Sequence, residues 1–133
     1  MKKLCLLLII CSLSLSSSCE SDDAKNPESE TWFLVNVSGG FAGINEDVDK
    51  GSVIWTFNSQ DSNLKIENNS DNNYSFESGN YSYSVLSANN NNYLVIENNE
   101  FGGMIETNSE LIIDQNMQSN GSGADKFILR FEK

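Results

Sequence analysis

The chain contains no histidine, and its three cysteines all lie within the first nineteen residues. Ser–His–Asp catalysis and histidine-ligated metal sites are therefore excluded. Residues 20–133 have no thiol, so they form no disulfide, no cysteine-based zinc site and no cysteine nucleophile. A hydrolase would have to rely on carboxylates, with Lys and Tyr as the other reactive groups. The sequence accordingly predicts a protein that is not an enzyme and needs no metal or cofactor.

Basic residues are also scarce: 8 Lys and Arg stand against 19 Asp and Glu. Lys2 and Lys3 precede Cys19 and all the acidic residues follow it, so the net charge from Cys19 onward is −13. Binding to phosphate backbones needs clustered Lys and Arg. This charge therefore argues against nucleic acid as a partner, and it favours solubility.

The first eighteen residues have the three parts of an export signal. Lys2 and Lys3 are followed by the apolar run Leu4–Leu15, by three serines and then by Cys19. The apolar run is shorter than the roughly 20 residues that span a bilayer. We therefore expect a lipoprotein signal peptide over residues 1–18, cleavage before Cys19, and a lipid anchor on that thiol. Ordinary secretion is the alternative, because Ser16 stands where the lipobox usually has Leu.

Residues 19–30 form the expected lipidated cysteine and tether. Glu20–Glu30 is polar, highly charged and contains the single proline, a composition typical of a disordered linker. Its eleven residues reach at most about 40 Å, so the domain would lie close to the membrane. The acidic stretch Cys19–Asp23 resembles the export signal of surface-exposed Bacteroidetes lipoproteins, although an acidic linker is the simpler reading. We expect an outer-membrane location, lipid-anchored, with exposure at the cell surface.

Residues 31–133 are enough for one domain. Short runs of alternating apolar residues recur every ten to fifteen positions, separated by Asn, Asp, Gly and Ser, which is the pattern of an all-β chain. Eight strands are expected: Thr31–Val37, Ser52–Asn58, Asn63–Asn68, Gly79–Ser87, Asn92–Glu97, Gly103–Thr107, Glu110–Asp114 and Lys126–Glu132.

Eight strands joined by short links favour an eight-stranded antiparallel up-and-down barrel, which leaves no sheet edge exposed. A two-sheet β-sandwich is the alternative, because alternation alone does not separate the two architectures. The alternation assigns these residues to the inward face: Val53, Trp55, Phe57, Leu64, Ile66, Tyr81, Tyr83, Val85, Tyr93, Val95, Leu111, Ile113, Phe127, Leu129 and Phe131.

Several short motifs resemble the lipocalin-like lipoproteins of Bacteroidetes. They are Thr31–Val35 followed by Gly39–Gly43, then Ile54–Asn58, Gly79–Tyr83, Leu111–Gln115, and Gly123–Phe127 with Arg130. The resemblance implies a lipocalin-like barrel that binds a small apolar or lipid-like ligand. It also implies that Arg130 packs over Trp32 to close the barrel base, a cation–π contact of about 0.5–2 kcal/mol.

Five aromatic residues are candidates to line a ligand cavity: Trp55, Phe57, Tyr81, Tyr83 and Tyr93. The alternative is that they fill the barrel, because eight strands leave an interior that side chains can just occupy. In the filled case any pocket would be small and near one mouth. The segment Gly39–Gly43, which contains Phe41, begins the longest connection, up to Gly51. It is either a flexible lid over the mouth or an ordinary turn with a buried Phe41.

Two groups of carboxylates are weaker candidates. Glu46, Asp47 and Asp49 could donate oxygens to Ca²⁺, but the spacing of a calcium loop is missing and solvated charges are the preferred reading. Glu97 and Glu100 could form an acid–base pair for glycoside cleavage, but nothing distinguishes them from surface carboxylates.

The sequence thus leads to two functional hypotheses. The first is a membrane-anchored, lipocalin-like lipoprotein that binds a small apolar or lipid-like ligand without catalysis. The second is a cell-surface module that uses a filled barrel as a scaffold and binds a protein or glycan partner. Aromatic residues exposed at a loop tip would favour the second hypothesis, and inward aromatic residues the first.

Overall fold

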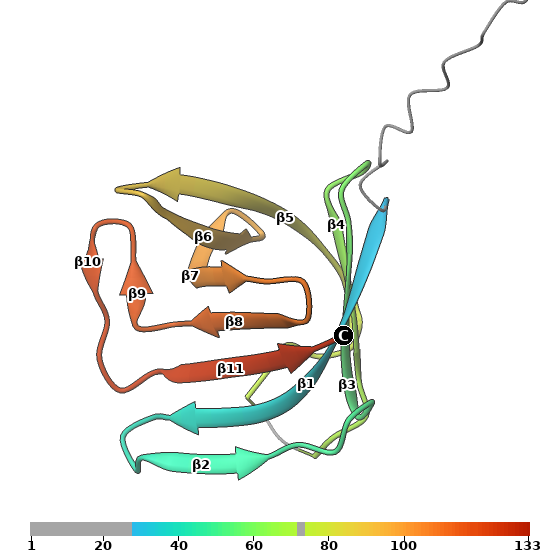
Figure 1. Ribbon diagram of the computed structural model, residues 1–133, viewed down its shortest axis with the longest axis horizontal. Coiled ribbons are helices and arrows are strands. Elements are labelled where there is room, and N and C mark those ends of the chain that lie inside the picture. Colours follow the sequence, from blue (N-terminus) through green and yellow to red (C-terminus); the bar gives the residue numbers. More distant parts are fainter. Residues whose placement is uncertain (1–27, 72–73) are drawn as a thin grey trace, which may run out of the picture.

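The computed structural model describes residues 28–71 and 74–133, which form strands and no helix (Figure 1). None of these residues belongs to a helix that could cross a membrane. The strands are β1 (Ser29–Gly39), β2 (Ile44–Asp47), β3 (Val53–Asn58), β4 (Asn63–Asn68), β5 (Gly79–Ala88), β6 (Asn91–Ile96), β7 (Asn99–Glu106), β8 (Glu110–Asp114), β9 (Met117–Gln118), β10 (Gly121–Ser122) and β11 (Phe127–Glu132). All eight predicted strands are present, while β2, β9 and β10 were not predicted.

Eight of these strands close into an antiparallel barrel. The order is β11-β8-β7-β6-β5-β4-β3-β1, and β11 also pairs with β1, so the hydrogen-bonded ladder returns to its start. The extra strand β2 pairs with the second half of β1. The predicted eight-stranded barrel is therefore confirmed, and the alternative of two separate sheets is wrong because the ladder is continuous.

Two long strands, β1 and β5, each pair with different neighbouring strands along their two halves. Residues 29–33 of β1 pair with β3, whereas residues 36–39 pair with β2 on one side and with β11 on the other. Likewise β5 pairs first with β4 and then, from Tyr83 onward, with β6. The two groups of strands therefore run across each other, with β3 and β4 upright and β8 and β11 horizontal in Figure 1. This crossing is the orthogonal form of sheet packing.

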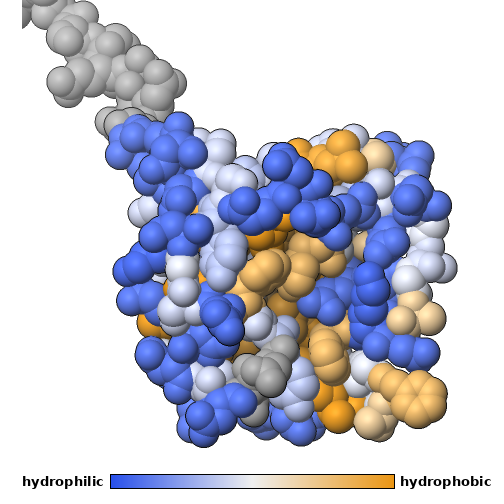
Figure 2. All heavy atoms as spheres, turned by 180° about the vertical axis from the view of Figure 1, so that it is seen from behind, coloured by the Kyte–Doolittle hydropathy of each residue, from blue (hydrophilic) through white to orange (hydrophobic). Residues whose placement is uncertain are grey.

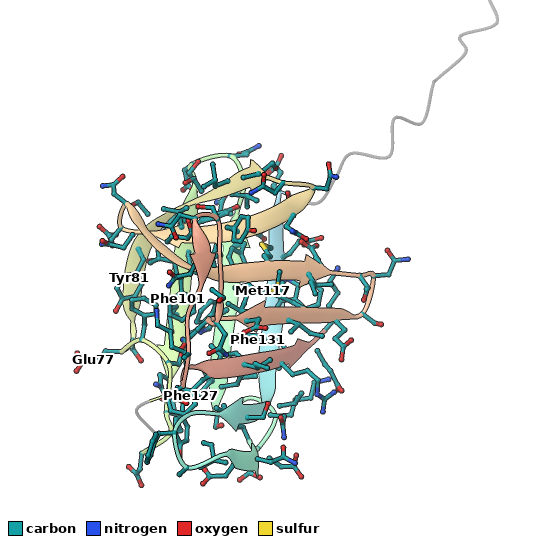
Figure 3. All side chains as sticks on the ribbon, turned by 90° about the vertical axis from the view of Figure 1, so that its left-hand side faces the viewer. Glu77, Tyr81, Phe101, Met117, Phe127 and Phe131 are labelled. Carbon is teal, nitrogen blue, oxygen red and sulfur yellow. The ribbon has the colours of Figure 1, made fainter. Side chains whose placement is uncertain are left out.

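The interior of the barrel is filled by side chains. The core residues are Trp32, Leu34, Val37, Val53, Trp55, Phe57, Leu64, Ile66, Leu94, Ile96, Leu111, Ile113, Leu129 and Phe131. Trp55 has no exposed surface, and its ring centre lies 4.9 Å from that of Phe131. Phe131 belongs to this core, Phe101 and Phe127 are partly buried and pack against it, and Glu77 projects from the edge of the barrel (Figure 3). Large inward aromatic residues thus occupy the space that a hollow barrel would leave.

The inward face predicted for β6 is wrong. Leu94 and Ile96 belong to the core, so the alternation of a strand turns Tyr93 and Val95 outward. Tyr93 is nevertheless only 4% exposed. Its cross-strand partner is Gly103, and a Cβ atom at Gly103 would lie 2.7 Å from Cβ of Met117. The β9–β10 hairpin therefore packs closely over this outer face, and a side chain at Gly103 would push it away.

A carboxylate fixes this hairpin to the barrel. Glu100 accepts hydrogen bonds from the backbone N–H and from Oγ of Ser119, both at 2.6 Å. Hydrogen bonds to a charged acceptor contribute about 1.5–3 kcal/mol. The hairpin is thus an outer cover of β6 and β7, which explains why Tyr93 is buried outside the core.

Candidate functional site

A cavity of about 200 Å³ opens at the barrel end where β1 begins. We call it the proximal mouth. β1, β3, β5 and β7 line it with Glu30, Trp32, Phe57, Tyr83, Met104 and Glu106, among others. The rings of Phe57 and Tyr83 meet edge to face with their centres 5.0 Å apart. Two of the predicted ligand-binding residues, Phe57 and Tyr83, are thus brought together here.

Lys133 lies beside this mouth. Its Nζ is 4.5 Å from the ring centre of Trp32 and 3.4 Å from Oε1 of Glu30. The cation over the Trp32 ring is therefore Lys133 and not Arg130, the residue that the resemblance predicts. Leu129 and Phe131 point into the core, so Arg130 points outward, where it pairs with Glu132 at 2.9 Å and with Glu110 at 3.6 Å. Lys133 follows Leu129 and Phe131 at the same two-residue spacing, so it lies on the inward side of the chain.

Carboxylates dominate the electrostatics of the proximal mouth. Partial burial raises the pKa of Glu106, and so does its hydrogen bond with Glu30, while Lys133 opposes the shift. Partial burial also raises the pKa of Tyr83, with smaller contributions from Asp61, Glu106 and Glu30. Negative charge is therefore in excess at this mouth.

A second, more open depression of about 300 Å³ lies near the other end of β1. We call it the distal groove, and its lining consists of Tyr74, Ser75, Phe76, Phe101, Gln115 and Phe127. The ring centres of Tyr74 and Phe127 are 5.0 Å apart, and those of Phe76 and Phe101 are 5.2 Å apart. Figure 2 shows that the rear face of the molecule carries apolar side chains in a hollow between polar borders. Aromatic rings thus reach the surface at this end as well.

Phe41 lies close to the distal groove but outside the barrel. It sits in the turn between β1 and β2 and is 92% exposed, so the expectation of a buried Phe41 is wrong. The turn itself packs on the groove, because a Cβ atom at Gly40 would lie 2.6 Å from the ring of Phe127. The long connection predicted here is instead a hairpin that holds an aromatic side chain in solvent.

The remaining predicted ligand-binding residues do not line either opening. Trp55 is enclosed in the core, and Tyr93 is buried under the β9–β10 hairpin. Tyr81 packs on Phe76 with ring centres 5.0 Å apart, and its hydroxyl donates to the backbone oxygen of Glu77 at 2.9 Å. These three side chains stabilise the fold.

The weaker carboxylate candidates also have structural partners. Glu46 accepts a hydrogen bond from the Tyr74 hydroxyl at 3.1 Å, which is the main cause of the raised pKa of Tyr74. Glu97 accepts the Ser82 N–H at 2.7 Å, while Glu100 holds the β9–β10 hairpin. Among residues 28–71 and 74–133, no group of three or more Asp and Glu side chains is arranged to hold a metal ion.

No protein-family model, curated protein or solved structure matches this chain. The predicted signal peptide, the predicted lipidation site Cys19 and most of the predicted tether lie outside the described residues.

Sequence reasoning missed three charged residues of the proximal mouth: Glu30, Glu106 and Lys133. Glu30 and Lys133 each lie one residue outside a predicted strand, and Glu106 lies in the predicted strand Gly103–Thr107, to which no inward face was assigned. Glu106 has the same parity as Met104, and Lys133 the same as Phe131. Extending the alternation by two residues would have placed both side chains at one end of the barrel.

Proposed function

We propose that this protein is a lipid-anchored lipoprotein of the outer membrane that binds a protein partner at the cell surface and catalyses no reaction. The barrel is its scaffold, since side chains fill most of the interior and leave a cavity of about 200 Å³ at the proximal mouth. The observation that supports this role is Phe41, an aromatic side chain that is 92% exposed at a hairpin tip beside an aromatic groove. A single exposed apolar residue is common on protein surfaces, but Phe41 adjoins the aromatic rings of the distal groove, and contiguous apolar patches of this kind mark interaction sites.

The hairpin that carries Phe41 is held in place by several hydrogen bonds. The Gly40 N–H donates to the backbone oxygen of Lys126, and the Gly43 N–H donates to that of Gly40, both at 3.0 Å. Nδ2 of Asn36 lies 3.0 Å from Oδ1 of Asn45 and 3.0 Å from Oδ1 of Asp47. A preorganised hairpin loses little conformational entropy when Phe41 enters a pocket on a partner.

Charge indicates the chemistry of that partner. Glu46 and Asp47 are exposed on β2, the strand that follows the Phe41 turn, and the exposed Asp49 comes shortly after that strand. Complementary charge accelerates encounter and selects partners. The partner is therefore a protein surface with an apolar pocket for Phe41 and basic side chains around it.

Co-purification of the full chain from native membranes tests this role. We expect one partner in stoichiometric amount, lost on Phe41→Ser and released by salt, because salt screens charge pairs at the rim of an interface. Ile105→Ser is the matched control, because Ile105 is also an exposed apolar residue, 52% exposed on β7. Recovery of the same protein with Phe41→Ser, or of no stoichiometric partner from the wild type, would contradict the proposal.

A second candidate function is the binding of a small molecule at the proximal mouth. Its support is the cavity of about 200 Å³, which brings Phe57 and Tyr83 together with Trp32. Pockets for drug-sized ligands measure about 300–1,000 Å³. A ligand of this mouth would therefore be small, and a lipid chain would not fit inside the packed barrel.

A further inference from the structure

The proximal mouth already holds an ammonium group, that of Lys133. This Nζ lies over the face of Trp32, 4.5 Å from the ring centre, and 3.4 Å from the Glu30 carboxylate. A cation within about 6 Å of an indole ring is attracted by its electron-rich face. The arrangement combines an aromatic face with a carboxylate, the two groups that bind organic ammonium ions.

The single positive charge of Lys133 does not balance the negative charge around it. Glu30 and Glu106 both line the cavity, and Asp61 is near enough to affect Tyr83. One ammonium cannot neutralise both lining carboxylates. The pKa of Glu106 is raised, mainly by partial burial and then by its hydrogen bond with Glu30. A second positive charge between the two carboxylates would oppose this shift and be attracted by both groups.

The remaining walls accept an apolar body. Phe57, Tyr83 and Met104 face the cavity together with Val85. The cavity of about 200 Å³ is below the usual range for drug-sized ligands, so it suits one ring or a short chain.

We propose that the proximal mouth binds a small organic ammonium ion whose apolar part lies against Phe57 and Tyr83 and whose charge lies between Trp32 and the Glu30 and Glu106 carboxylates. Lys133 is then an internal competitor that leaves the Trp32 face when the ligand enters. The proposal rests on the second candidate function, small-molecule binding at this mouth, and adds the chemical class of the ligand.

Calorimetric titration of the full chain, kept in a nonionic maltoside detergent, tests this inference with phenethylammonium as the probe. The neutral compound 2-phenylethanol has the same ring and serves as the matched ligand. We expect phenethylammonium to bind roughly tenfold more tightly than 2-phenylethanol, in line with a desolvated cation–π and carboxylate contact. Glu30→Gln should remove most of this difference, whereas Glu77→Gln, an exposed carboxylate outside the mouth, should preserve it.

Lys133→Met distinguishes competition by Lys133 for the Trp32 face from a general effect of the protein's net charge. It should tighten phenethylammonium binding several-fold, whereas Lys65→Met, which removes the same charge from an exposed site on β4, should change it little. Equal tightening by both variants, or weaker binding by Lys133→Met, would overturn the role of Lys133. Equal binding of both probes would overturn the ammonium class but leave small-molecule binding at the mouth. If neither probe binds, both the ammonium class and small-molecule binding at this mouth are overturned.

Discussion

The indole Nε1 of Trp55 donates a hydrogen bond of 3.1 Å to Oγ of Ser75. Trp55 lies at the centre of the filled core, and Ser75 belongs to the lining of the distal groove. This bond connects the interior of the barrel to the segment that covers one of its ends, and it satisfies a donor that has no access to water.

Ser75→Ala should therefore destabilise the domain. Removing the acceptor leaves the buried indole N–H without a partner, which costs about 1–3 kcal/mol. Urea unfolding followed by tryptophan fluorescence measures the change. Ser84→Ala, at an exposed position of β5, is the control and should stay within about 0.5 kcal/mol of the wild type. If the two variants were equally stable, the hydrogen bond of Trp55 would have no energetic role.

Glu100→Gln should loosen the β9–β10 hairpin without unfolding the barrel. The substitution replaces the charged acceptor of two hydrogen bonds from Ser119, and such bonds contribute about 1.5–3 kcal/mol. Amide hydrogen exchange should accelerate at residues 117–122, while the exchange of β8 and β11 should not change. The Tyr93 ring should become accessible to chemical iodination. Unchanged protection of the hairpin would mean that contacts such as that of Met117 over Gly103 hold it without Glu100.

Glu106→Gln should stabilise the fold, and more so as the pH rises. The pKa of Glu106 is raised above its ordinary value of 4.5, mainly by partial burial. The folded state thus retains this proton where the unfolded chain has lost it, so wild-type stability falls as the pH rises from about 4.5 through the raised pKa. A neutral Gln does not incur this loss.

Urea unfolding over a pH series measures the effect of Glu106→Gln. The stability difference from the wild type should grow across this window and then remain constant above it. Glu77→Gln is the control, because this carboxylate is exposed outside the mouth, and it should show no such trend. A difference that is independent of pH would show that the environment of Glu106 does not favour the protonated form.

Cys19→Ser should prevent membrane anchoring. If lipid is attached to Cys19, the variant has no thiol at the attachment site and should leave the outer-membrane fraction, because the lipid is the anchor. Cell fractionation and intact-mass measurement of the purified chain check this. Cys11→Ser, within the apolar run of the predicted signal, should be processed and lipidated normally. A wild-type chain without lipid mass would indicate ordinary secretion instead.

The fold followed from local patterns in the sequence to a large degree. Alternation in Val53–Phe57 and Leu64–Ile66 identified strands and their inward faces, because a half-buried strand repeats every two residues. The Asn-rich links also acted as expected: Asn89 and Asn90 have φ of 52° and 62°, the positive values that a two-residue hairpin turn requires. The closure of the barrel was a prediction about strand number and link length, and it is confirmed.

The wrong inward face of β6 has a physical cause, which is that the alternation of a single strand is compatible with either face pointing inward. For β6 both Tyr93 with Val95 and Leu94 with Ile96 are apolar, so the pattern did not say which pair points inward. The β9–β10 hairpin decided this by covering the outer face, and its strands of two residues are too short to show a pattern. Phe41 likewise could be buried or exposed until the position of its hairpin was known.

The sequence by itself determined what chemistry is absent, that residues 31–133 are all-β, and where a lipid anchor is to be sought. These properties depend on composition and on local periodicity. Only the tertiary structure decided that the interior is filled, that Lys133 rather than Arg130 lies over Trp32, and that Glu30 and Glu106 meet at one mouth. Those relationships join strands distant in the chain, and their register and closure are set by how all the side chains pack together.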